Sequence, residues 1–485
     1  MLGGIVALAA ALRFTLIGQH SLWFDEAFVV WVTRLRWQEI LPALRGMDNH
    51  PPLYYLLMKG WVSIAGRDEV ALRVPSACFS TLCVPLTYAL MRRTSREWVS
   101  LLGAFLVSVS PLGIMTGQEA RMYPLLSALA LGSTLAVAAC AERGRAADWI
   151  VYVGLATAMI YTHHLGLFVL AAHGAWIILY ERRHVVPWLW SLAVVVVLYT
   201  PWIPALWDQT HHVNTQLFGS MTYREPGDLL GLFAFGGSLF GMGTYFSSGP
   251  LKPIEQLIVL LPFLVTLWRG VVSLRTDRSG LALLGLPPAV TIGVVLVISL
   301  VKPAFNPRWF SFLAPFYAMF LARGIVDVAE GLRGQRDRSV ALLTAGVLLY
   351  SMPVLTPYYA NPAARPYQWR SAAALVKRQA RPQDLLLYVG VEPKVVFTYY
   401  LQDPPPSLTL AAAPGSPGNP SLTVQQVRML AGRFPRVWLV VTNPFTPVSP
   451  FVHEQLLPAL DRGYRMIGGR DFDGIWIYLL EARPR

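Results

Sequence analysis

Residues 281–301 read LALLGLPPAVTIGVVLVISLV, a run without a single charged side chain. The hydrocarbon core of a bilayer is about 30 Å thick and needs roughly twenty apolar residues of helix, so this run predicts a transmembrane span. The whole chain shares this composition, because 54% of its 485 residues are hydrophobic and only 14% are charged. A soluble globular chain usually carries roughly a quarter charged residues. The sequence therefore predicts a multi-pass membrane protein.

Hydropathy along the chain predicts about eleven transmembrane helices. The N-terminal run has no basic residue ahead of it and no cleavage site, which favours a retained first helix. Segment 228–246 is apolar but rich in glycine, and we expect an interfacial or re-entrant piece there, because a span would invert the charge of every later loop. The predicted spans lie near residues 1–18, 69–91, 98–116, 122–141, 148–162, 165–181, 186–206, 253–271, 281–301, 309–328 and 338–356.

Arginines in the loops predict the orientation. Every second loop carries them, which is the positive-inside pattern and predicts a cytoplasmic N-terminus in the cell (inner or plasma) membrane. These arginines explain much of the formal charge of +13, and no recognisable nucleic-acid module accompanies them, so nucleic-acid binding is not expected. The basic loops hold Arg92, Arg93 and Arg96; Arg143 and Arg145; Arg182 and Arg183; Arg269, Arg275 and Arg278; and Arg333, Arg336 and Arg338. The outer segments are 19–68, 117–121, 207–252, 302–308 and 357–485.

The chain divides into two predicted domains. Residues 1–359 form the transmembrane domain, with a first outer loop at 19–68 and another at 207–252. Within the first outer loop, residues 27–44 predict an amphipathic helix in the interface. Residues 360–485 predict an extracytoplasmic α/β domain, because helix-like stretches alternate with short apolar runs there. The helix-like stretches are 367–378, 424–434 and 451–461, the apolar runs are 385–389, 436–441 and 475–480, and 403–420 is a predicted loop.

Two acids, Asp25 and Glu26, follow the first span directly in the sequence Trp23-Phe24-Asp25-Glu26. Carboxylates at a membrane boundary are costly to desolvate, and acids that face a membrane cavity usually serve a function. The same pair also suits a helix that begins at Ala27 with Asp25 as its N-cap. The residues alone leave both interpretations open.

A histidine precedes two prolines in Asp48-Asn49-His50-Pro51-Pro52-Leu53-Tyr54-Tyr55. Proline in the first turn of a helix explains the Pro-Pro step but not His50. An imidazole at this place can donate a hydrogen bond to a phosphate oxygen or transfer a proton. We count His50 as a candidate phosphate ligand, and Asp48, Tyr54 and Tyr55 as further cavity candidates.

Three more outer segments carry cations, histidines or acids. A guanidinium suits a phosphate, although an arginine at a membrane boundary can also extend to lipid headgroups. A lysine at such a boundary has the same two possible roles, phosphate ligand or headgroup contact. At least one histidine of the His163-His164 pair is expected to be structural. The candidate phosphate ligands are Arg121, Tyr123, Arg308 and Lys302, and the further cavity candidates are Glu119, His163 and His164. All five clusters map to one membrane face, which predicts a cavity for a phosphorylated lipid.

The order of six motifs resembles the bacterial relatives of protein O-mannosyltransferases and of the lipid A aminoarabinose transferase. These are polytopic glycosyltransferases of the GT-C class. The resemblance covers most of residues 1–330, and the order of the motifs is more specific than any one of them. The motifs are LWFDEA (22–27), HPPLYYLL (50–57), LRVPSACFSTLCVPL (72–86), QEARMYPLL (118–126), YTHHLGLF (161–168) and NPRWFSFLAPFYAMFLARGI (306–325).

The resemblance implies inverting transfer of a sugar from a polyprenyl-phosphate donor to a lipid, glycan or protein acceptor on the outer face. In that family the acid of the first outer loop is essential, which implies that Asp25 is the general base, with Glu26 beside it. Aminoarabinose transferases carry an acidic-basic pair before the prolines, where this chain has Asn49-His50. The second carboxylate is therefore missing or shifted to Asp48, and involvement of a divalent cation (Mg or Mn) stays open.

Two other functions fit a chain with this many spans. A transporter or lipid flippase usually places its polar residues mid-membrane on broken helices and often has repeated halves. Here the polar clusters lie at the outer ends of the spans, and no internal repeat is evident. A non-catalytic scaffold for the C-terminal domain leaves the motifs of residues 22–55 without a purpose. The transferase is therefore the favoured interpretation, with the transporter as the alternative.

Overall fold

A computed structural model describes residues 1–212, 253–301, 307–332, 335–363, 367–401, 403–410, 433–442 and 451–484. The chain forms two compact units. The first contains Met1–Ile17 and Leu35–Ala360, and the second contains Gly18–Arg34 and Asn361–Arg485. The predicted re-entrant segment 228–246 and the predicted helix over 424–432 lie outside the described residues.

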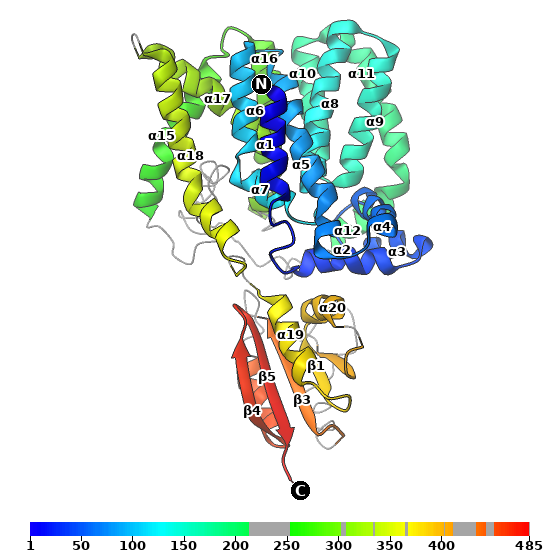
Figure 1. The fold of residues 1–485 in the computed structure, drawn as a ribbon. Helices are drawn as coiled ribbons and strands as arrows, with labels where there is room; N and C mark the ends of the chain where they lie inside the picture. Colours follow the sequence, from blue (N-terminus) through cyan, green and yellow to red (C-terminus); the bar gives the residue numbers. More distant parts are fainter. Residues whose placement is uncertain are drawn as a thin grey trace. The chain divides into compact units, whose positions relative to one another are not determined.

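The first unit is a bundle of helices that run side by side (Figure 1). Every predicted span coincides with a helix or a helix pair. Six described helices are long and apolar enough to cross a membrane, or seven if one bent pair is a single span, so this is a membrane protein. The helices are α1 (Leu2–Phe14), α3 (Trp37–Met47), α4 (Leu53–Ala65), α5 (Glu69–Met91), α6 (Glu97–Ser108), α7 (Pro111–Gly117), α8 (Tyr123–Arg143), α9 (Ala146–Thr162), α10 (Gly166–Tyr180), α11 (Val185–Tyr199), α12 (Ile203–His212), α15 (Pro253–Val272), α16 (Arg278–Val301), α17 (Ala314–Gly331) and α18 (Arg336–Ala360), with 3₁₀ turns η1 (Arg182–His184), η2 (Thr200–Trp202) and η3 (Pro307–Leu313).

The predicted span 98–116 is bent by 54° between α6 and α7. Ser110 accepts a hydrogen bond from the Gly113 amide and Pro111 fills the first turn, so a new helix begins at this point. The break leaves carbonyl groups at the end of α6 without helical partners. Arg13 of α1 supplies the donors: Nη1 bonds the Ser108 carbonyl at 2.8 Å and Nη2 bonds the Val107 carbonyl at 3.0 Å.

The prediction of one amphipathic helix over 27–44 is wrong. The structure has two helices, α2 (Phe24–Arg34) and α3, because Arg36 adopts an extended conformation with φ −66° and ψ 153°. Glu39 accepts from the Arg36 amide at 2.9 Å and so starts a new helix as in a capping box. The break also separates the two units, since α2 belongs to the second and α3 to the first.

The basic loops of the first unit meet at one end of the bundle (Figure 1). Arg323 of α17 donates to the Thr94 carbonyl at 2.7 Å and to the Ser273 hydroxyl at 3.0 Å, which joins the α5–α6 and α15–α16 loops. Arg93 pairs with Glu142 at the end of α8. The alternation of charge in the sequence therefore corresponds to a common end of these helices. The side of the membrane on which this end lies stays a prediction.

The second unit is a five-stranded mixed sheet in the order β2-β1-β3-β5-β4 with helices on both faces. Alternate residues of each strand point to opposite faces, so Leu386 and Trp438 pack under α19 and α20, while Leu387 and Leu439 pack against the C-terminal helices. The elements are α19 (Trp369–Gln379), α20 (Val391–Tyr400), η4 (Phe451–Leu456), α23 (Leu457–Asp461), β1 (Leu385–Val389), β2 (Ser407–Leu410), β3 (Arg436–Thr442), β4 (Tyr464–Asp471) and β5 (Ile475–Ala482).

Two strands were not predicted, and both lie at an edge of the sheet. Strand β2 lies inside the predicted loop 403–420 and pairs in parallel with β1. Strand β4 reads YRMIGGRD and is mostly exposed, so it lacks the apolar run that marks the three inner strands. An edge strand pairs on one side only and needs less burial, which explains why hydropathy missed both.

Candidate functional site

The turn before α4 holds a buried carboxylate–imidazole pair. Asp48 Oδ1 lies 2.9 Å from His50 Nδ1, and its Oδ2 accepts from the Tyr55 hydroxyl at 2.5 Å. His50 is 9% exposed. The Pro-Pro step and the start of α4 fix the backbone here, so a short turn presents both side chains in one place. A carboxylate on Nδ1 orients the ring.

The environment keeps Asp48 ionised. Burial by itself raises the pKa of this carboxyl group, but the charge and hydrogen bond of His50, the guanidinium of Arg121 and the hydroxyl of Tyr55 together hold the pKa below its usual range. The pair therefore places a fixed negative charge beside the His50 ring, and this carboxylate lies two residues before the histidine in the sequence.

His163 packs against this pair. Its ring centroid lies 5.0 Å from that of His50 and 6.0 Å from that of Tyr123. Nδ1 accepts a hydrogen bond from the Leu165 amide at 3.2 Å, so the hydrogen of the neutral ring is on Nε2. Nε2 is buried and has no hydrogen-bond partner among the described residues. Burial, then the charges of His50, His164 and Arg121, lower the pKa of His163 well below its usual value.

His164 is held by partners on both ring nitrogens. Nε2 lies 3.1 Å from Gln209 Oε1 and Nδ1 lies 3.3 Å from the Tyr199 hydroxyl. Gln209 also donates to the Asp48 carbonyl at 2.8 Å, which ties α12 to the turn before α4. Burial lowers the pKa of His164 to about 4. This ring therefore positions the turn and stays neutral.

Arg121 and Glu119 are both buried in the turn before α8, with 3% and 2% of their surface exposed. The Arg121 carbonyl accepts from the Ser76 hydroxyl at 3.0 Å, and Tyr54 joins this hydroxyl at 3.0 Å. Arg121 acts electrostatically on both Asp48 and His163. The first unit therefore brings together His50, Asp48, Tyr55, Arg121, His163 and Tyr123 in one basic cluster.

Asp25 and Glu26 lie in the first turn of α2, in the second unit. Glu26 is fully buried and accepts from the Trp23 amide at 3.4 Å, so it closes the start of the helix. The interpretation of Asp25 as N-cap of a helix beginning at Ala27 is wrong, because α2 begins at Phe24. Asp25 is half-buried.

Sequence reasoning missed Glu392, which follows strand β1 and Gly390 at the start of α20. Helices α2 and α20 pack together, with Ala27 and Val396 in one core and the Tyr400 hydroxyl accepting from the Leu22 amide at 2.7 Å. Burial, and then the charge of Asp25, raise the pKa of Glu392 to about 7. An acid just after an inner parallel strand was the only sequence signal for this residue.

The side chains of Lys302 and Arg308 are not part of the described structure. Lys302 lies outside the described residues, and only the backbone of Arg308 is described. Within the ranges that the structure describes, no group of three His, Cys, Asp or Glu residues is arranged to hold a metal ion.

Comparison with known proteins identifies the fold. Residues 49–207 match the family model of dolichyl-phosphate-mannose-protein mannosyltransferase, a range that contains His50, Arg121 and His163. ArnT from Cupriavidus metallidurans in the apo state matches with a TM-score of 0.60 and 13% identity, over 100% of this chain and 99% of that chain. The chain is a glycosyltransferase of the GT-C fold.

Two further structures share the fold of this glycosyltransferase. ArnT from the same organism bound to undecaprenyl phosphate has a TM-score of 0.51 at 13% identity, over 100% of this chain and 99% of that chain. The Archaeoglobus fulgidus oligosaccharyltransferase complex with Zn and sulfate has a TM-score of 0.56 at 11% identity, over 98% of this chain and 72% of that chain. No curated protein matches the glycosyltransferase.

Proposed function

We propose that this glycosyltransferase moves a sugar from a polyprenyl-phosphate donor to an acceptor on the outer (periplasmic or extracellular) face, with inversion at the anomeric carbon. The buried Asp48–His50 pair beside Arg121 and His163 carries this proposal, because it offers cationic and neutral N–H donors to a phosphate. A relative with the same fold, ArnT, binds undecaprenyl phosphate.

Asp25 is the proposed general base. The acceptor oxygen attacks the anomeric carbon and forms the new glycosidic bond, while its proton passes to the Asp25 carboxylate. The bond between the anomeric carbon and the phosphate oxygen breaks at the same time, and its electron pair leaves with the polyprenyl phosphate. Glu26 supports this step indirectly, since its bond to the Trp23 amide fixes the turn that carries Asp25.

The departing phosphate needs charge stabilisation more than a proton. We assign this role to the His50 side chain, the Arg121 guanidinium and the Nε2 hydrogen of His163, with Tyr123, Arg308 and Lys302 as further candidates. Donors that are fixed before the reaction stabilise developing charge without reorganisation. Asp48 is a positioning residue here, because its bond to Nδ1 holds the His50 ring.

The acceptor is a lipid, glycan or protein on the outer side, and the second unit is proposed to be extracytoplasmic with the N-terminus in the cytoplasm. Residues 361–485 form this unit, together with residues 18–34. The Archaeoglobus fulgidus oligosaccharyltransferase was crystallised with Zn and sulfate. For this chain, the proposal includes a divalent cation (Mg or Mn) as an optional cofactor, which the EDTA arm of the test below examines. Asp48 already binds His50 and Tyr55, so no step of the proposed mechanism passes through a metal.

The test compares purified wild type with Asp25→Ala in detergent, using a panel of polyprenyl-phosphate sugars. Free polyprenyl phosphate is measured by mass spectrometry, with and without candidate acceptors and EDTA, and product configuration by NMR. Asp337→Ala is the matched control, because Asp337 also lies in the first turn of a helix, α18, and is exposed. We expect release by wild type and by the control but not by folded Asp25→Ala. Unchanged release by Asp25→Ala would overturn the assignment of the base.

A further inference from the structure

An apolar groove with a volume of about 830 Å³ opens along the side of the first unit. Helices α5, α8 and α9 line it. From α8 it takes Leu125, Ala128, Gly132, Ala136 and Ala139, which lie on one face of a helix at spacings of three and four residues. The lining continues to residue 143, so the groove follows α8 for about 27 Å at 1.5 Å per residue.

The groove has arginines at only one of its ends. Its charged lining residues are Arg92, Arg93, Arg143 and Glu142, which all lie where α5 and α8 end. Three cations against one acid give this end a positive balance, whereas the rest of the lining is uncharged. A ligand that matches this pattern has a long apolar part and one anionic head.

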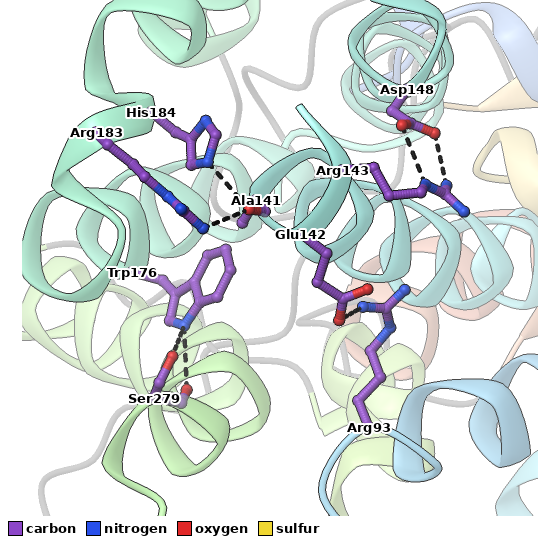
Figure 2. A network of polar contacts seen from close by, with 9 residues as sticks. All are labelled: Arg93, Ala141, Glu142, Arg143, Asp148, Trp176, Arg183, His184 and Ser279. Carbon is purple, nitrogen blue, oxygen red and sulfur yellow. Dashed lines mark hydrogen bonds and ion pairs between the residues drawn. The ribbon is translucent and has the colours of Figure 1, made fainter. Parts of the chain in front are cut away.

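The arginines keep donors for such a head. Figure 2 shows Arg93 bonded to Glu142, and Arg143 bonded to Asp148 through Nε at 3.1 Å and Nη2 at 2.6 Å. Arg92 bonds the Ser95 carbonyl through Nη1 at 3.1 Å. A guanidinium has five N–H donors, so these bonds leave hydrogens on all three side chains for phosphate oxygens.

Neighbouring loops fix the end of α8 that carries this cluster. Arg183 Nη2 and His184 Nε2 lie 3.1 and 3.0 Å from the Ala141 carbonyl, and Trp176 bonds Ser279 on the next helix pair (Figure 2). The last turn of α8 is thus held by η1 through Arg183 and His184, by Arg93 after α5, and by Asp148 of α9, which fixes the Arg143 guanidinium. A binding site needs this kind of support around its ligating side chains.

We propose that this groove binds an anionic glycerophospholipid of the surrounding bilayer. One acyl chain lies along α8 beside Gly132, and the phosphate lies against Arg92, Arg93 and Arg143. The donor does not explain this site. Its proposed phosphate ligands lie at the start of α8, because Arg121 lies just before this helix and the His163 ring lies 6.0 Å from that of Tyr123. The arginines of the groove lie at the other end of this helix of 21 residues, roughly 30 Å away. One donor phosphate therefore does not reach both, and the inference is independent of the proposed chemistry.

Native mass spectrometry of the delipidated full chain tests the proposal. Dioleoyl phosphatidylglycerol, dioleoyl phosphatidylcholine and undecaprenyl phosphate are titrated separately. The variants are the double change Arg92→Gln/Arg143→Gln at the head end and Gly132→Leu in the groove, where an added Cβ already meets Leu155 at 3.6 Å. The matched controls are Arg96→Gln, an exposed arginine of the same loop, and Gly154→Leu, where a Cβ meets nothing within 4 Å.

We expect wild type to prefer phosphatidylglycerol over phosphatidylcholine. Each arginine removed is expected to weaken phosphatidylglycerol binding about fivefold, since one cation near an anionic lipid contributes about 1 kcal/mol. Gly132→Leu is expected to abolish the bound lipid, and both controls are expected to bind like wild type. Equal binding of the two phospholipids by wild type overturns the proposal, even if a variant fails to fold. Tighter binding of undecaprenyl phosphate, with loss in the arginine variants, would assign the groove to the donor's lipid instead.

Discussion

His50 lies between two groups that act on it in different ways. Asp48, at 2.9 Å from Nδ1, fixes the orientation of its ring, whereas the ring of His163, at 5.0 Å, contributes only a dipole because burial keeps it neutral. The cluster thus places two imidazoles within a single turn region. A phosphate that leaves during a reaction gains from the Nε2 hydrogen of His163.

Asp48→Asn is expected to weaken the donor complex about 10- to 100-fold, seen as a higher KM for the polyprenyl-phosphate sugar. The change removes the negative partner of His50 but keeps the size of the side chain, and loss of one charge-assisted hydrogen bond costs roughly 1.5–3 kcal/mol. Steady-state kinetics on the purified protein measures it. Asp208→Asn is the control, because its ion pair with Arg45 is partly exposed and such pairs contribute little. An effect on kcat alone would contradict the assignment of Asp48 as a positioning residue.

Glu392→Gln is expected to stabilise the second unit at pH 8 and to leave it unchanged at pH 4. The folded-state pKa of Glu392, about 7, lies above the unfolded value of about 4.3, so its favourable contribution is complete below pH 4.3 and is lost as the pH rises through 7. The gain at pH 8 is about 1–2 kcal/mol. Hydrogen exchange of peptides from β1 and β3, corrected for the intrinsic rate, measures it.

The matched variant is Glu481→Gln, because Glu481 lies in β5 of the same sheet with its side chain 46% exposed. Glu481→Gln is expected to leave the hydrogen-exchange rates of these β1 and β3 peptides nearly unchanged, both at pH 4 and at pH 8. A stabilisation by Glu392→Gln that is as large at pH 4 as at pH 8 would show that burial of the carboxylate is not its cause.

At the scale of elements, each predicted span corresponds to helical structure in the bundle, since the bilayer requires a minimum length of apolar helix. Helices α3 and α4 lie outside the predicted spans. Hydropathy did not reveal the break at Ser110 or the role of Arg13, because an average over a window ignores unpaired carbonyls. Arg13 is fully buried inside a predicted span, and its bonds to Ser80, Val107 and Ser108 explain why a cation is tolerated there.

Arg13→Leu is expected to destabilise the first unit by about 2–4 kcal/mol, because two buried carbonyls at the end of α6 lose their donors. Thermal unfolding in detergent measures the loss, which corresponds to a lower midpoint. Arg96→Leu is the control, since this arginine is exposed and its side chain makes no capping bond at the start of α6. Equal midpoints for the two variants would mean that the α6–α7 break does not depend on Arg13.

For the candidate site, local sequence predicted His50, Asp48 and His163, which lie in short turns next to helix ends. Glu392 was not predicted, because its neighbour Asp25 lies in a segment far away in the sequence that only the folded second unit brings close. A site formed by residues of one turn can be predicted from a sequence motif. A site formed by distant segments that pack together cannot be predicted in this way.

For the whole molecule, the common end of the basic loops predicts which residues face the cytoplasm. The test uses Ala146→Cys at the start of α9 and Ser371→Cys on α19, because both residues are exposed. Each is placed in a chain whose three cysteines are changed to alanine. A membrane-impermeant maleimide is expected to label residue 371 in intact cells and residue 146 only after lysis. The reverse pattern would contradict the predicted orientation.

Residues 18–34 belong to the second unit although they are synthesised long before its other residues, 361–485. Ala27 packs in the same core as Trp369, Val396 and Trp438, so α2 has no hydrophobic partner until the end of the chain has been synthesised. At 5–20 residues per second, this delay is roughly 20–80 s. A chain that stops near residue 360 therefore contains α2 but lacks the strands and helices whose core buries Ala27.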